Sequence, residues 1–167
     1  LTLGVNESIL WAPAIGDIDG DAEVDIIFTT VIQGGEGRLY ALNHDGTTKT
    51  GFPNLLMGIF PQMAVLGDID LDGNDEIICS RRVSSTESYQ LVIEGDGSNY
   101  PGWPFDMQNY PGSSAAIGDI DNDGTIEIVS ESRDYLWVWD KNGVVRTGFP
   151  FDLDPSNITL NSYAAPI

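Results

Sequence analysis

The chain has 167 residues, 26 acidic and 7 basic side chains, and a net charge of −19 with a sequence pI near 4.1. With so few cations and no basic patch, we expect no nucleic-acid partner and no attraction to an anionic membrane surface. No apolar stretch is long enough to span a bilayer, so we expect no membrane insertion, and the single cysteine excludes an internal disulfide.

One acidic motif occurs three times at a constant interval along the chain. It reads IGDIDGDAEVDII from Ile15, LGDIDLDGNDEII from Leu66 and IGDIDNDGTIEIV from Ile117. The first aspartate of each copy is therefore 51 residues from the next (68 − 17 and 119 − 68). A period of this size is typical of repeat proteins, in which each unit buries its core against its neighbours.

Each repeat contains the same elements in the same order. A small, apolar run such as residues 113–118 precedes the acidic loop, and β-branched runs follow the loop at 26–28, 77–79 and 128–130. A second apolar alternation (39–42, 91–93, 136–139) ends in Gly-containing turns at 43–46, 95–97 and 141–143, which favour β-hairpins. A Gly-aromatic-Pro sequence at 51–53, 102–104 and 148–150 is expected to close an edge strand or to lead the chain across to the next unit. No window has a helical period.

Four short strands per repeat predict an all-β fold of β-propeller-type blades, three tandem four-stranded antiparallel repeats of about 51 residues. We place the repeats at 8–58, 59–109 and 110–160 within one repeat domain (1–167), with 161–167 beginning a further repeat. Three blades are too few to close a ring. The chain is therefore either part of a longer propeller or satisfies its open edges with other copies of itself, as a ring or a fibre.

The acidic loops have the composition of metal sites. Loop positions 1, 3, 5 and 9 carry carboxylates, and a backbone carbonyl near position 7 can turn inward, which gives six or seven oxygen ligands and favours Ca²⁺ over Mg²⁺. The candidate ligands at positions 1, 3, 5, 7 and 9 are Asp17, Asp19, Asp21, Glu23 and Asp25 in loop 1; Asp68, Asp70, Asp72, Asn74 and Glu76 in loop 2; and Asp119, Asp121, Asp123, Thr125 and Glu127 in loop 3. We predict about three calcium sites, one per repeat; the alternative is solvated turns without a metal.

Position 6 of each loop must reverse the chain with a positive φ. Gly73 and Gly124 provide this without steric cost, whereas loop 1 has Ala22 there and Gly20 at position 4. We therefore expect loop 1 to curl differently from the other two.

The GDIDxDGxxEI loop, the LWVWDKNG hairpin and the GFPF closure resemble the FG-GAP/VCBS repeats. That resemblance implies calcium-binding β-propellers, as in the integrin α-subunit headpiece and many bacterial surface and secreted proteins. The family's ligand positions correspond to Asp119, Asp121, Asp123 and Glu127, and to the equivalent residues of loops 2 and 1.

No catalytic constellation stands out in the sequence. His44, the only histidine, lies in a hairpin turn, and Cys79 lies in a β-branched run where burial is expected. Trp137 and Trp139 share one strand face, which we expect to be buried; Trp11, Trp103, Tyr40, Tyr110 and Tyr135 either pack between blades or line a carbohydrate platform.

We therefore expect a non-catalytic, extracellular calcium-binding propeller module at the cell surface or secreted, because oxygen-only sites are useful where calcium is millimolar. It would act as a structural, adhesion or ligand-binding scaffold, self-assembling or not through unpaired blade edges. Its partners would be a protein or carbohydrate ligand and further blades from the same or another copy. The alternative is a set of blades from a secreted carbohydrate-active enzyme such as a polysaccharide lyase.

Overall fold

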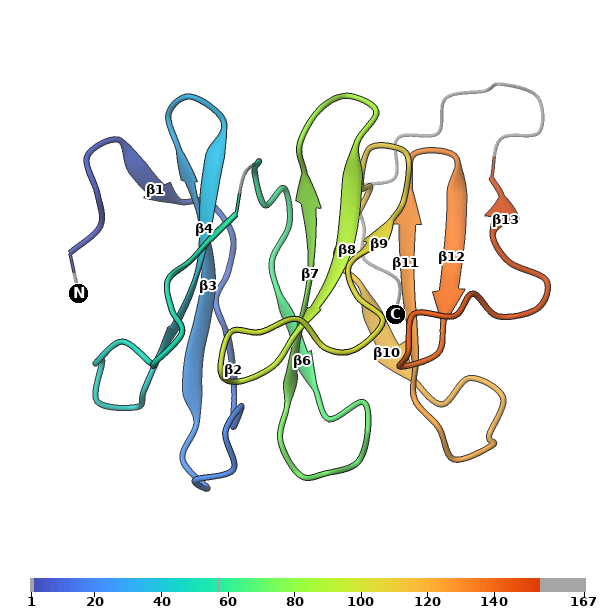
Figure 1. Ribbon diagram of the computed structural model, residues 1–167, viewed down its shortest axis with the longest axis horizontal. Helices are drawn as coiled ribbons and strands as arrows, with labels where there is room; N and C mark the ends of the chain where they lie inside the picture. The colour runs from blue at the N-terminus through green and yellow to red at the C-terminus, as the bar shows by residue number, and fades with distance from the viewer. Residues whose placement is uncertain (1, 57, 154–167) are drawn as a thin grey trace.

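The computed structural model describes residues 2–56 and 58–153, which form three antiparallel sheets side by side along the long axis of the molecule (Figure 1). Blade 1 contains β1 (Glu7–Ile9), β2 (Ala14–Gly16), β3 (Asp25–Ile32), β4 (Glu36–Leu42) and β5 (Asn54–Leu56). Blade 2 contains β6 (Val65–Gly67), β7 (Glu76–Arg82), β8 (Ser88–Ile93) and β9 (Phe105–Asp106). Blade 3 contains β10 (Ala116–Gly118), β11 (Glu127–Ser132), β12 (Tyr135–Trp139) and β13 (Phe151–Asp152).

Strand order follows chain order in every blade, so the all-β architecture of β-propeller-type blades is confirmed. In blade 2 the order is β6-β7-β8-β9, and in blade 3 it is β10-β11-β12-β13. A glycine with positive φ ends the turn after the third strand: Gly46 (83°), Gly97 (85°) and Gly143 (76°). The division at 8–58, 59–109 and 110–160 stays a prediction, and the further repeat expected at 161–167 lies outside the described residues.

The innermost strand is interrupted. In blade 1 the two pieces are β1 and β2, which pair with the far and near ends of β3, so this sheet has five strands. In blades 2 and 3 the far piece is reduced to single bridges, Ile59 with Arg82 and Pro111 with Ser132. The far piece of the innermost strand thus occurs in every blade and is longest in blade 1.

The hydrophobic core lies between blades. The face of blade 1 packs on blade 2 through residues from both sheets, among them Ile27, Leu39, Ile77 and Leu91. Blade 2 packs on blade 3 through a second cluster that is rich in aromatic residues, including Trp103, Met107, Trp137 and Trp139. Burial at these two interfaces supplies most of the apolar area that stabilises each four-stranded unit, which could not bury it alone.

A side chain on each following blade packs over a glycine of the preceding one. Leu66 of blade 2 lies over Gly16, where an added Cβ would be 2.9 Å from Leu66 Cδ1. Ile117 of blade 3 packs in the same way over Gly67. Only a residue without a side chain allows these inner strands to approach so closely.

The aromatic residues mostly pack, as expected. Trp137 and Trp139 are buried and stacked, with ring centroids 5.8 Å apart. Trp103 is buried between blades 2 and 3, as predicted, whereas Tyr40 is buried within blade 1, where its ring stacks on Phe28. Three of the group are more exposed: Trp11, Tyr110 and Tyr135.

Candidate metal centre

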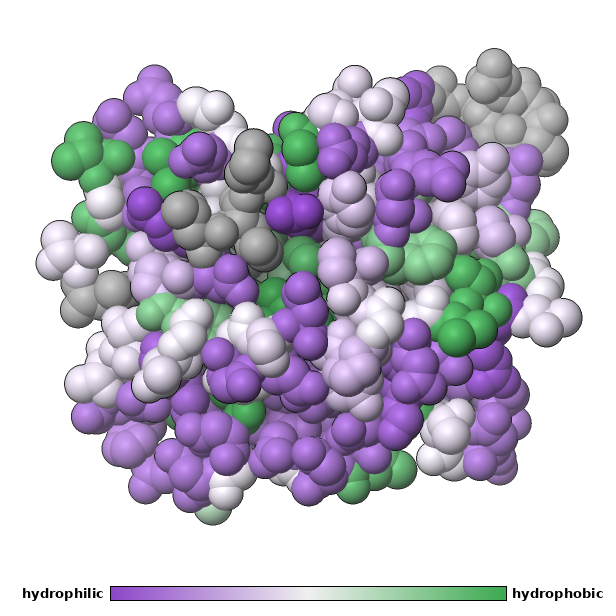
Figure 2. Space-filling model, viewed as in Figure 1, coloured by the Kyte–Doolittle hydropathy of each residue, from purple (hydrophilic) through white to green (hydrophobic). Residues whose placement is uncertain are grey.

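The three acidic loops connect the first and second strands of each blade and project from one edge of the molecule (Figure 1). That edge is largely hydrophilic, as the lower margin of Figure 2 shows. Positions 1, 3 and 9 of each loop converge, with one oxygen from each of the three carboxylates lying within 4.8 Å of the others. We name these groups cluster 1 (Asp17, Asp19, Asp25), cluster 2 (Asp68, Asp70, Glu76) and cluster 3 (Asp119, Asp121, Glu127).

All three loops have a positive φ at the same two positions. Position 6 has a positive φ in each: Ala22 (67°), Gly73 (101°) and Gly124 (89°). Position 4 does too, at Gly20 (75°), Leu71 (64°) and Asn122 (60°). Loop 1 differs in its hydrogen bonds, as expected: Asp17 Oδ1 accepts the N–H of position 4 (Gly20, 2.7 Å), whereas in loops 2 and 3 the equivalent oxygen accepts the N–H of position 5 at 3.0 Å.

Backbone donors hold the carboxylates at positions 1 and 9. The N–H of position 6 donates to the carboxylate of position 1 in every loop, at 2.8 Å for Ala22 to Asp17 and 2.9 Å for Gly73 to Asp68. The N–H of position 2 donates to the buried position 9 carboxylate, at 2.9 Å for Ile69 to Glu76. These bonds fix the oxygens before any ion arrives, and the loop is preorganised.

The position 5 aspartates lie outside the three clusters. Each accepts the N–H of position 7, at 2.8 Å for Glu23 to Asp21 and for Asn74 to Asp72. The position 7 side chains differ in their contacts: Glu23 pairs with His44 at 2.8 Å, and Thr125 bonds Asp123 at 2.5 Å. The assignment of positions 5 and 7 as ligands stays a prediction.

Clusters 1 and 3 each contain a cation that the sequence patterns did not reveal. Lys49 Nζ is 2.7 Å from Asp19 and 2.7 Å from the buried Asp25. Although burial alone would lower it, these two carboxylates raise the pKa of Lys49. In cluster 3, Arg146 lies 2.5 Å from Glu127 and also pairs with Asp121.

Cluster 2 has a neutral group in place of the cation. The Tyr100 hydroxyl donates to Asp70 at 3.0 Å, and no cation pairs with this cluster among the described residues. Burial, with the charges of Asp70, Glu94 and Asp72, raises the pKa of Glu76 to about 7. Burial and Asp70 likewise raise the pKa of Glu94. Cluster 2 therefore carries a negative charge that the protein does not compensate.

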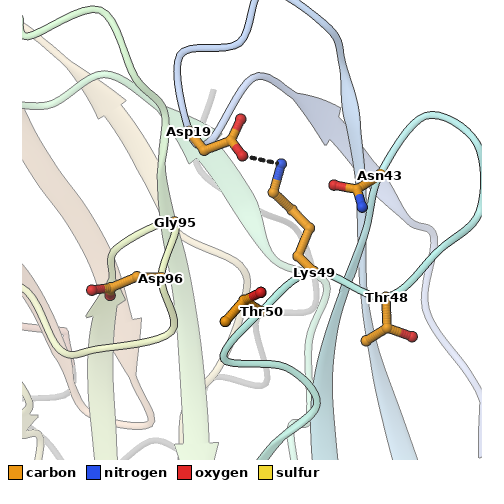
Figure 3. Close-up of a pocket in the computed structure, with 7 residues that line it drawn as sticks. All are labelled: Asp19, Asn43, Thr48, Lys49, Thr50, Gly95 and Asp96. Atoms are coloured by element: carbon orange, nitrogen blue, oxygen red, sulfur yellow. Dashed lines mark ion pairs between the residues drawn. The ribbon is translucent and has the colours of Figure 1, made fainter.

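A polar pocket of about 290 Å³ opens beside cluster 1, between blade 1 and the turn after β8 (Figure 3). Lys49 reaches across it to Asp19, and Asn43, Thr48 and Thr50 lie along the same side. Gly95 and Asp96 of blade 2 form the opposite wall (Figure 3). Lys49 thus forms part of the pocket wall although only 5% of its side chain is exposed.

The spacing of the cluster oxygens fits one metal ion. Two ligands on opposite sides of Ca²⁺ are about 4.6–5.2 Å apart, because each Ca–O distance is about 2.3–2.6 Å. Oxygens within 4.8 Å of one another can therefore share a single ion of this size. The three clusters could each bind a metal, with the buried position 9 carboxylate as the innermost ligand.

Residues 68–130 match the family of FG-GAP-like repeats. The match covers less than half of the chain. The matched segment begins at the first aspartate of loop 2 and ends within β11, so it contains all of loops 2 and 3. The resemblance to FG-GAP repeats is thereby confirmed for this FG-GAP segment, and loop 1 carries the same aspartates in an equivalent place.

No curated protein sequence matches the chain. Among solved structures it is similar to the exotype rhamnogalacturonan lyase YesX, with 16% identity and a TM-score of 0.44 over 83% of this chain and 40% of that chain. It is also similar to the V. cholerae biofilm matrix protein Bap1, with 18% identity and a TM-score of 0.33 over 80% of this chain and 27% of that chain. The chain spans less than half the length of either protein.

Proposed function

We propose that this chain is a calcium-stabilised, non-catalytic FG-GAP module that acts outside the cell as a scaffold and joins further blades through its two terminal faces. One observation carries the calcium assignment: the same three-carboxylate cluster, with a buried acid at position 9, recurs in all three blades. Repulsion among such close charges is costly, and a divalent cation removes it.

The donor set favours calcium among the divalent ions. Each cluster offers only hard oxygen ligands, and with the position 5 and 7 groups within the same loop the shell can grow to six or seven oxygens. Three bound Ca²⁺ would reduce the net charge from −19 to about −13. Sites of this kind are useful where calcium is millimolar, which supports an extracellular location. None of the described residues forms a helix long and apolar enough to cross a membrane.

The groups best suited to catalysis are otherwise engaged, which supports a non-catalytic role. His44 is exposed in its turn and paired with Glu23. Cys79 is buried, and burial raises the pKa of its thiol to about 12, so it is not a nucleophile at neutral pH. The cluster acids are held by backbone N–H groups in the geometry of a metal site.

The two terminal faces of the module carry complementary halves of its internal interface. Ile15 of blade 1 occupies the position of Leu66 and Ile117, yet it is 69% exposed because no blade precedes it among the described residues. Gly118 of blade 3 occupies the position of Gly16 and Gly67, and no described residue lies within 4 Å of the place where its Cβ would be. A knob (Ile15) and a hole (Gly118) of the kind that joins blades inside the chain are thus both left unfilled by residues 2–56 and 58–153.

Each terminal blade exposes a further apolar side chain. Val24, at position 8 of loop 1, is 53% exposed, and Ile120 of blade 3 is 54% exposed, although its equivalents Ile18 and Ile69 are buried in the clusters between blades. The occupant that fits both faces is another blade of the same kind, which for this chain alone is a second copy. Such a heterologous contact closes into a ring or extends into a fibre. A protein or carbohydrate ligand at the cell surface stays a further prediction.

Thermal unfolding in calcium, magnesium and chelator tests the calcium assignment. A site with a Kd about 100-fold below the calcium concentration adds roughly 2.7 kcal/mol, which corresponds to about 5–10 °C in Tm for a chain of this size. We expect a rise of at least that size in calcium and a much smaller one in magnesium. Equal melting temperatures in calcium and in chelator would contradict the proposal.

Light scattering in millimolar calcium tests the assembly. We expect a mass above the 18.1 kDa of one chain, and we expect Gly118→Val to restore the monomer because the valine fills the hole without meeting any other described residue. A wild-type chain that stays monomeric up to high concentration would overturn the assembly part of the proposal. Turnover of a polysaccharide by the chain would favour the enzyme alternative.

A further inference from the structure

One position in each blade reaches the acidic cluster from outside the loop. It lies three residues after the turn glycine, and its backbone N–H bonds to the third strand at 2.8–2.9 Å. The three backbone bonds are Lys49 to Ala41, Tyr100 to Val92 and Arg146 to Val138. The three side chains therefore start from equivalent backbone points and differ only in their chemistry.

In blades 1 and 3 this side chain occupies the oxygens that a metal ion needs. Lys49 contacts the carboxylates at positions 3 and 9 of its loop, and Arg146 contacts the same two positions of loop 3. Both cations are largely buried, with side-chain exposures of 5% and 27%. They are two of only seven basic residues in the chain, so their presence in two of three equivalent sites is a specific feature.

In blade 2 the equivalent contact is a single neutral hydrogen bond. Tyr100 donates its hydroxyl to Asp70 and leaves Glu76 to the Ile69 N–H. A calcium ion entering cluster 2 displaces no positive charge, whereas in clusters 1 and 3 it must separate an ion pair or share the site with a cation. Coulomb repulsion between the ion and the resident cation then weakens binding at those two clusters.

We propose that Lys49 and Arg146 are resident counter-ions that lower the calcium affinity of loops 1 and 3, so that loop 2, with Tyr100, is the site that fills first. In the calcium-free protein, one cation offsets part of the charge of the three carboxylates in clusters 1 and 3, and loop 2 depends most on the metal. This grading rests on the calcium function proposed above and deepens it, because one module then responds to calcium in two steps.

A calcium titration followed by two-dimensional ¹H–¹⁵N NMR reads the three loops separately. The backbone amide at position 6 donates to the cluster aspartate in each loop, so the amides of Ala22, Gly73 and Gly124 report on their own sites. We expect the Gly73 amide to respond at a calcium concentration about tenfold lower than the other two, since calcium binding at those loops must break or weaken the ion pairs of Lys49 or Arg146. The grading would be overturned if the three amides had equal calcium midpoints, or if the Gly124 or Ala22 amide responded at a lower calcium concentration than the Gly73 amide.

Exchanging the two side chains provides the matched test. In Arg146→Tyr, we expect the Gly124 amide to reach half of its change at the same calcium concentration as the Gly73 amide. In Tyr100→Arg, we expect the calcium concentration for half of the Gly73 change to rise about tenfold. Lys49→Gln makes the same comparison in loop 1 and does not depend on either exchange variant folding. Unchanged midpoints in folded variants would overturn the proposal. If none of the three amides responds to calcium, the proposed calcium function itself is wrong. If all three respond at the same calcium concentration, only the grading is wrong.

Discussion

Replacing Glu76 by glutamine should change the stability of the module in opposite directions with and without calcium. The pKa of Glu76 is raised from 4.5 to about 7 in the folded protein, chiefly by burial. Between these two pH values the folded protein holds a proton on Glu76 that the unfolded chain has released. Stability in chelator therefore falls as the pH rises from about 4.5 to 7, and it remains lower above pH 7.

The size of this effect follows from the same shift. The difference between 4.5 and about 7 corresponds to about 3 kcal/mol at most, since one pKa unit is 1.36 kcal/mol. A neutral glutamine side chain at this position would keep an amide oxygen to accept the Ile69 N–H and would carry no charge at pH 8. We expect Glu76→Gln to raise the free energy of unfolding in chelator at pH 8 by about 1–3 kcal/mol and to lower it in calcium, because a ligand is lost.

Chemical denaturation measures the free energy of unfolding under four conditions: pH 5 and pH 8, each in calcium and in chelator. Glu127→Gln is the matched control at the same loop position, where Arg146 lies 2.5 Å from the carboxylate. There the loss of charge breaks an ion pair, so we expect destabilisation in chelator by about 1–2 kcal/mol. If Glu76→Gln destabilises the chelator-treated protein at pH 8 as Glu127→Gln does, the account of an uncompensated cluster 2 is refuted.

Three further predictions concern stability and packing. Glu7→Ala should lower the free energy of unfolding in urea by about 3 kcal/mol, because it leaves the partly buried Arg38 without the carboxylate that lies 2.6 Å from it. A decrease of less than about 0.5 kcal/mol would contradict this. Gly67→Val should destabilise the monomer by about 2 kcal/mol or more through collision with the next blade, whereas Gly118→Val should leave the monomer's melting temperature unchanged. Cys79 should react with a thiol reagent only as fast as the protein unfolds, and rapid labelling of folded protein would show that the core between blades 1 and 2 opens locally.

The strands and loops could be predicted because their signals are local. A β-branched run, an Asp-Gly turn and an acidic loop each specify their own conformation within a few residues, and the period then assigns one blade to each copy. Ala22 was harder to place. Its left-handed φ costs about 1–2 kcal/mol more than a glycine would, and its N–H makes the same bond to the position 1 carboxylate, at 2.8 Å, as the glycines of loops 2 and 3.

The cluster cations could not be predicted from local patterns. Lys49 lies 24 residues after Asp25, and Lys, Tyr and Arg share no chemical type that would mark a repeated position. Alignment of the repeats on Gly46, Gly97 and Gly143 would have put the three residues in one column. The interruption of the innermost strand was also missed, since it depends on pairing with the far end of the second strand rather than on the residues themselves.

Calorimetric titration of the chelator-treated chain with calcium tests the central claim most directly. We predict about three calcium ions bound per chain, with the substitution of Asp68, Asp70 and Glu76 by their amides removing one of them and leaving the fold intact. No heat of binding at millimolar calcium, or a stoichiometry that this triple substitution does not change, would contradict the assignment of the acidic clusters as calcium sites.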